Sequence, residues 1–109
     1  MIDKYELLEL FESEPKIIDE EAGEYEYKKE DVFGFTLEMA IFLYDAHCSL
    51  TLKHKALKYP IFDLGFDKID YIKCKDEKLF IHQAGSKKDV VVYFKPNYTF
   101  AFEDSLPLQ

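Results

Sequence analysis

The side chains best suited to metal binding or nucleophilic chemistry are three histidines and two cysteines: His47, His54, His82, Cys48 and Cys74. None of them forms a Cys-x-x-Cys or His-x-x-x-His pattern, the spacings that bring two metal ligands together. On an extended strand, His47 and His54 point to opposite faces, and the adjacent His47 and Cys48 side chains point apart. A compact site would require the fold to bring Cys74 or His82 alongside. We therefore predict no metal site and interpret both cysteines as reduced, packed thiols.

The carboxylates and glycines form no catalytic or phosphate-binding pattern either. Asp63, Asp67 and Asp70 lie close together in the sequence. Their segment, Asp-Leu-Gly-Phe-Asp, lacks the alternating oxygen ligands of a calcium loop. The four glycines stand alone, so there is no glycine-rich phosphate loop. We predict no catalytic residue and no cofactor, and we interpret these acids as solvated loop residues.

Length and composition fit one globular domain that does not bind nucleic acid. The chain has 109 residues, of which 48% are hydrophobic, and ten Phe and eight Tyr supply bulky core material. All of its basic residues are lysine, although arginine is the usual residue for bidentate contacts with phosphate and guanine. With a net charge of −8, the electrostatic term that dominates nucleic-acid binding is repulsive.

The sequence also predicts a cytoplasmic location. The longest apolar run, Met39 to Tyr44, is far shorter than the ~20 residues of a membrane-spanning helix. The first residues, Met-Ile-Asp-Lys, do not form a charged-then-apolar leader for export. Two cysteines are too few for a disulfide framework, which agrees with a reducing compartment.

The negative charge is concentrated in the first third of the chain. Residues 1–31 contain 12 acids and four lysines and so carry the whole net charge, whereas residues 32–109 contain ten of each. Such a segment is either a solvated surface or a docking face whose field steers a basic partner. Tyrosines among the acids suit an interface, although they could instead cap the core. The predicted partner-binding residues are Asp19, Glu20, Glu21, Glu24, Tyr25, Glu26 and Tyr27.

The hydrophobic pattern predicts an α+β fold with an N-terminal helix and an antiparallel meander of about six or seven strands. We expect a helix over residues 3–12, with Asp3 as its N-cap and Glu6 as the capping-box partner. Period-two alternation begins at Phe33, and a helix over residues 36–45 is the main alternative there. The single domain then divides into an acidic helix and loop region (1–31), a sheet (32–104) and a loose tail (105–109).

Two hairpins are expected in the second half of the chain. The first turns at Asp76-Glu77, which places Ile72 opposite Ile81 and Cys74 opposite Leu79. The second turns at Pro96-Asn97 between two strands rich in valine and aromatic residues. Short turns between successive strands favour pairing in sequence order.

Acidity, small size and a meander from Lys68-Ile69-Asp70-Tyr71-Ile72 through Val90-Val91-Val92-Tyr93-Phe94 together resemble immunity proteins of bacterial toxin systems. The resemblance transfers no functional residue. It implies a non-enzymatic inhibitor that binds a basic, nuclease-like toxin and occludes its active site. Two alternatives remain: a phage-type mimic of nucleic-acid charge that blocks a DNA-binding protein, and a small ligand-binding or structural β-domain. The sequence does not distinguish a monomer from a dimer.

Overall fold

The computed structural model describes residues 2–105 and begins with a short amphipathic helix, α1 (Lys4–Phe11). Asp3 is its N-cap, as predicted, because the Asp3 Oδ1 atom accepts hydrogen bonds from the backbone N–H groups of Tyr5 and Glu6. Glu6 does not complete a capping box; its Oε1 atom instead accepts from the backbone N–H of Cys74 at 3.1 Å. The helix therefore uses Glu6 to attach itself to a strand far along the chain.

Five strands form the first sheet, in the order β1-β2-β3-β4-β5 and antiparallel throughout. They are β1 (Lys16–Asp19), β2 (Glu24–Glu30), β3 (Phe35–Phe42), β4 (His47–His54) and β5 (Phe62–Phe66). Strands β3 and β4 alternate between buried and partly exposed residues, so one face of the sheet lies in the core. Residues 43–45 form a 3-10 turn, η1 (Leu43–Asp45), which separates β3 from β4.

Four strands form the second sheet, in the order β6-β7-β8-β9. They are β6 (Ile69–Lys75), β7 (Lys78–Gln83), β8 (Lys88–Tyr93) and β9 (Thr99–Asp104). The predicted register of the first hairpin is confirmed, since Ile72 pairs with Ile81 and Cys74 with Leu79. The second hairpin is also present, with β8 and β9 paired over six consecutive positions.

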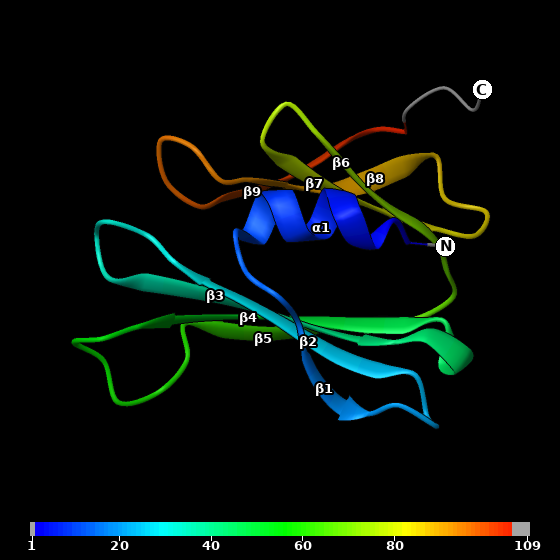
Figure 1. Ribbon diagram of the computed structural model, residues 1–109. Coiled ribbons are helices and arrows are strands. Elements are labelled where there is room, and N and C mark those ends of the chain that lie inside the picture. Colours follow the sequence, from blue (N-terminus) through cyan, green and yellow to red (C-terminus); the bar gives the residue numbers. More distant parts are fainter. Residues whose placement is uncertain (1, 106–109) are drawn as a thin grey trace.

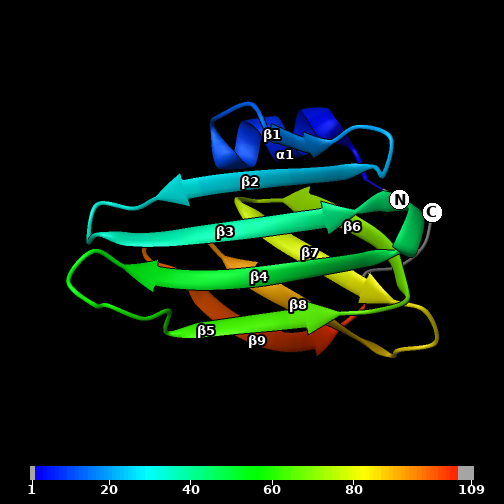
Figure 2. The same ribbon diagram turned by 90° about the horizontal axis from the view of Figure 1, so that it is seen from below.

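The two sheets stack face to face, and α1 lies between them along one side (Figure 1). Leu7, Leu10 and Phe11 of the helix are buried in one cluster with residues of both sheets. Phe11 packs against Tyr27 of β2, with the ring centroids 5.4 Å apart. It also packs edge to face against Phe94, which follows β8, with the centroids 5.3 Å apart. On the other side of the molecule β5 and β9 lie near each other, where Phe62 and Phe100 meet (Figure 2).

The α+β class and the antiparallel arrangement were predicted correctly, but the details differ. The described residues contain nine strands in two sheets rather than six or seven strands in one meander. The helical alternative over 36–45 is not adopted, because β3 occupies that segment up to Phe42. Ser105 is held by Asp89 and so is not loose, while residues 106–109 of the predicted tail lie outside the described residues. Within residues 2–105, no helix has the length and apolar character that crossing a membrane requires.

Candidate protein-binding surface

The acidic residues predicted to bind a partner gather at the turn between β1 and β2. The Asp19 Oδ1 atom accepts from the backbone N–H of Ala22, and the N–H of Gly23 donates to the carbonyl of Glu20. Gly23 has a φ of 67°, and a Cβ there would lie 3.1 Å from the Cβ of Leu43, so glycine fits this position best. The Leu43 N–H donates to the Gly23 carbonyl at 3.0 Å, which fastens the turn to η1 at one end of the sheet (Figure 2).

The carboxylates of this turn are free to act on a partner. Asp19, Glu20 and Glu21 are exposed, and Glu24 is half-buried. None of these four makes an ion pair with another of the described residues. Glu26 lies further along β2, opposite Lys16 of β1, so a lysine lies next to its charge. The carboxylates of residues 19–24 are therefore the part of the acidic turn that makes no ion pair among the described residues.

The two predicted tyrosines lie on the inner side of β2. Tyr27 is 1% exposed, and burial, followed by the charge of Glu14, raises the pKa of its hydroxyl. It therefore belongs to the core and cannot serve as a surface anchor. Tyr25 is half-buried, and the Lys4 ammonium lies over its ring at 4.5 Å from the centroid. Only part of Tyr25 can reach a partner.

The structure identifies another aromatic residue at the same end of the sheet. Tyr44 of η1 is 74% exposed, and its ring lies against Gly23, where a Cβ would be 3.2 Å from the Tyr44 Cε2 atom. Asp45 beside it is exposed as well. The period-two alternation predicted that the strand continues through Tyr44, so the exposed position of its ring was not predicted. Asp45, a residue type disfavoured in strands, was a local sign that the strand ends there, and Ala46 after it takes the left-handed conformation.

The cysteines lie apart from this surface. Cys48 is buried and Cys74 is half-buried, and both are free thiols. Burial raises the pKa of Cys48 to about 12, and burial together with the charges of Glu6 and Asp3 raises that of Cys74 to about 12. At neutral pH both remain protonated, and the thiol form is a poor nucleophile and a poor metal ligand.

The three aspartates around Gly65 make three separate contacts. Asp63 accepts from the Thr51 hydroxyl, Asp67 pairs with His47 at 2.7 Å, and Asp70 lies 4.0 Å from His82. His54 binds the carbonyl of Phe33 and accepts from the N–H of Ala56, so it serves as a loop brace. Within residues 2–105, no three His, Cys, Asp or Glu side chains are placed together to hold a metal ion.

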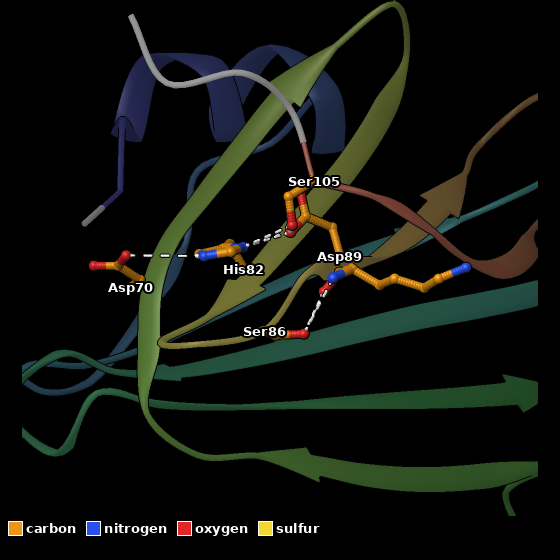
Figure 3. Close-up of polar contacts among 6 residues, drawn as sticks. Asp70, His82, Ser86, Asp89 and Ser105 are labelled. Carbon is orange, nitrogen blue, oxygen red and sulfur yellow. Dashed lines mark hydrogen bonds and ion pairs between the residues drawn. The ribbon is translucent and has the colours of Figure 1, made fainter.

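One polar cluster on the outer side of the four-stranded sheet joins the buried Asp89 and the mostly buried His82 to Ser105 and to the exposed Asp70 (Figure 3). Asp89 is fully buried; its Oδ1 atom lies 2.7 Å from His82 Nδ1 and accepts from the Ser105 hydroxyl at 2.9 Å. Ser105 Oγ also lies on the Nδ1 side, at 3.1 Å. A Ser-His-Asp triad needs a hydroxyl and a carboxylate hydrogen-bonded to opposite ring nitrogens. The carboxylate on the Nε2 side, Asp70, lies 4.0 Å away, beyond hydrogen-bond distance, and the Ser105 hydroxyl donates to Asp89, so this cluster does not have that geometry.

Comparison with known proteins gives a match in structure but none in sequence. No known protein family and no curated protein sequence matches the chain. A solved structure does match, a contact-dependent growth inhibition toxin–immunity protein complex from Klebsiella pneumoniae 342. The TM-score is 0.76, the identity is 14%, and the match covers 94% of each chain. The chain has the fold of one component of that toxin–immunity protein complex, which agrees, at the level of the fold, with the resemblance predicted from the sequence.

Proposed function

We propose that this chain is a non-enzymatic inhibitor, an immunity protein that neutralises a cognate toxin in the cytoplasm by occluding its active site. The observation that carries the proposal is the fold likeness, because it extends over 94% of both chains. The acidic turn supports the proposal, since the active site of a nuclease-like toxin is basic and attracts carboxylates.

The interface is proposed at the end of the five-stranded sheet where the acidic turn and η1 meet. The unpaired carboxylates there provide steering toward a basic surface, and Tyr44 provides rigid apolar area next to them. Tyr25 contributes its exposed portion. Tyr27 is left out, because its ring is sealed against Phe11.

The test is the binding of the chain to its proposed cognate toxin, sought first in the neighbouring open reading frame. The variant replaces Glu20, Glu21, Glu24 and Glu26 by Gln. Long-range attraction acts on the encounter, so we expect association to slow about tenfold or more at low salt and its salt dependence to flatten. Stopped-flow fluorescence at several salt concentrations measures both quantities.

A matched control removes four charges from the other sheet. Asp70, Asp76, Glu77 and Asp104 are all exposed, so changing them to Asn or Gln alters the net charge equally at a different place. We expect this control to keep most of the steering. Equal slowing by both variants would show that only total charge matters. An unchanged rate in the first variant would move the interface to the neutral part of the chain after residue 32.

A second variant separates anchoring from steering. Tyr44→Ala should leave the association rate nearly unchanged and speed dissociation about tenfold, because an aromatic anchor contributes after docking. Tyr25→Ala should have a smaller effect in the same direction, since part of that ring is already covered by Lys4. If Tyr25→Ala has the larger effect, the exposed part of Tyr25 rather than η1 faces the toxin.

A further inference from the structure

Two loops extend from the end of the five-stranded sheet that lies opposite the acidic turn (Figure 2). They are residues 31–34, between β2 and β3, and residues 55–61, between β4 and β5. Among the described residues, five of the eleven large apolar side chains that are exposed belong to these loops, and we call them the apolar tip: Val32, Phe33, Leu57, Tyr59 and Ile61. Val32 is 91% exposed and Tyr59 72%. Exposed apolar side chains gathered in one place mark an interaction surface.

Hydrogen bonds join the two loops and engage their backbone groups. The Lys55 N–H donates to the Gly34 carbonyl at 3.1 Å, and His54 Nε2 lies 2.9 Å from the Phe33 carbonyl oxygen. Three more N–H groups of the second loop donate within the chain: those of Ala56, Leu57 and Ile61. Backbone groups that are already bonded can leave water at little cost, which contact with lipid requires.

Lysines surround the apolar tip. Residues 46–62 contain three lysines and no acid. Lys53 is paired with Glu38 at 2.9 Å, whereas Lys55 and Lys58 make no ion pair with another described residue. All three lysines line one hollow of about 320 Å³. This end of the sheet is therefore locally basic, although the chain as a whole is acidic.

We propose that this end of the molecule docks reversibly on an anionic membrane surface, with the apolar tip among the lipid headgroups and Lys55 and Lys58 next to the phosphates. Tyrosine and lysine suit that depth, because each has an apolar part and a polar end. Apolar contact and attraction to anionic lipid add together in surface binding of this kind. Such docking needs no membrane-spanning segment.

The acids of the molecule do not prevent this contact. The acidic turn lies the length of β2 away, seven residues or roughly 20 Å. The Debye length at physiological salt is about 8 Å, so the repulsion of the turn is screened at the membrane. Glu30 is the exposed acid next to the first loop, and it lines the same hollow as Lys95. Asp31 is engaged, since its Oδ1 atom accepts from the N–H groups of Phe33 and Phe35.

An acidic protein is the other partner that these lysines could attract. A protein interface uses direct hydrogen bonds, and the backbone N–H groups of Phe33, Lys55 and Leu57 are already bonded. Lysine also lacks the planar fork by which arginine recognises a carboxylate, and the chain contains no arginine. Flexible lysines around an apolar tip therefore fit a fluid anionic surface better than a fixed protein surface.

Cosedimentation of the full chain with lipid vesicles tests the contact. The vesicles contain equal parts of phosphatidylglycerol and phosphatidylcholine, with pure phosphatidylcholine for comparison. We expect wild type to bind the anionic vesicles at least about tenfold more tightly than the neutral ones. Lys55→Gln with Lys58→Gln should remove most of that preference, and Leu57→Ser with Tyr59→Ser should weaken binding about tenfold. No binding of wild type to the anionic vesicles would overturn the proposal, and loss of toxin binding in the Leu57 and Tyr59 variant would then assign the tip to a protein partner.

Matched double variants make the same kinds of change elsewhere. Lys68→Gln with Lys87→Gln removes two exposed charges from the loops after β5 and before β8. Tyr5→Ser with Phe102→Ser removes exposed apolar area from α1 and β9. Both controls should bind the vesicles as wild type does. Equal losses in the tip variants and in their controls would overturn the proposal, because binding would then depend on total charge and apolar area.

A tryptophan reporter locates the contact, since the chain contains no tryptophan. The fluorescence of Tyr59→Trp should shift to the blue on anionic vesicles, whereas that of Tyr44→Trp at the acidic turn should not shift. Inorganic phosphate, compared with chloride at equal ionic strength, should not reverse the first shift, because a free ion replaces only the headgroup charge. Reversal by phosphate would make a free anion the ligand, and a shift in Tyr44→Trp alone would place the other end on the membrane; either result would overturn the proposal.

Discussion

Each half of the molecule contains a histidine–aspartate pair with the same separation, and the two pairs differ in burial. His47 Nδ1 and Asp67 Oδ1 lie 2.7 Å apart beside the five-stranded sheet, and the Asp67 side chain is 83% exposed. His82 Nδ1 and Asp89 Oδ1 also lie 2.7 Å apart, but Asp89 is fully buried. Water screens the first pair and not the second, so the same geometry has a different energetic weight in each sheet.

The difference extends to the charges of the two sheets. The four-stranded sheet uses carboxylates internally: Asp89 holds His82 and Ser105, and Glu103 accepts the hydroxyl of Tyr93. The acidic turn of the five-stranded sheet leaves its carboxylates unpaired among the described residues. A carboxylate that accepts hydrogen bonds from its own fold is engaged there, whereas an unpaired surface carboxylate can act on another molecule.

The largest loss of stability is expected at Phe11, the helix residue that packs against both sheets. Phe11 touches Tyr27 of one sheet and Phe94 next to the other, so Phe11→Ala should lower the free energy of unfolding by about 3–5 kcal/mol. Urea unfolding followed by far-ultraviolet circular dichroism measures the loss. Tyr5→Ala on the exposed side of the same helix is the control and should change little. Two separate transitions in Phe11→Ala would show that the sheets unfold independently.

The histidine–aspartate pairs give the next largest effect. Asp89→Ala should lower the free energy of unfolding by about 3 kcal/mol, because it leaves the Ser105 hydroxyl and a mostly buried imidazole without their acceptor. Asp67→Ala should change it by less than about 1 kcal/mol, since that pair is screened by solvent. Chemical denaturation of both variants under one condition makes the comparison. Similar losses would mean that burial does not distinguish the two pairs.

Cysteine replacement gives a smaller effect. Cys48→Ala should cost about 1–2 kcal/mol, because it removes a small buried group from the core face of β4, and function should survive. Cys74→Ala should cost no more, since that side chain is half-buried. Loss of toxin binding in a folded Cys48→Ala variant would contradict the structural role assigned to it.

The cysteine pKa values also predict a pH dependence. Burial raises the pKa of Cys48 from 9.0 to about 12, so the native state retains this proton over a range where the unfolded chain releases it. The stabilisation is complete below pH 9 and is lost as the pH rises toward 12. Cys48→Ala should flatten the alkaline arm of the stability curve measured by urea titration. Fast reaction of native Cys48 with a thiol reagent at pH 8 would contradict the raised pKa.

The sequence predicted what depends on local pattern. The Asp3 cap and the Ile72–Ile81 register follow from spacing within a few residues, and the structure confirms both. The split into two sheets did not follow, because strand alternation is the same whether neighbouring strands continue one sheet or begin another. The positions of Tyr27 and Tyr44 were predicted wrongly for a related reason. A tyrosine next to acidic residues shows the same sequence pattern whether its side chain is buried or exposed.

The attachment of α1 to β6 has a consequence for the order in which the protein can assemble on the ribosome. Glu6 holds the backbone of Cys74, 68 residues later, and Tyr98 donates to the carbonyl of Lys29 across a separation of 69. The first sheet is a local meander and can form as it is synthesised, whereas the contact of Glu6 with Cys74 must wait for a strand made much later. Until the second sheet has been synthesised, the inner face of β3, including Leu37, Met39 and Ile41, lacks that cover. The helix α1, which already contacts Tyr27 of β2, is then the described element available to shield it.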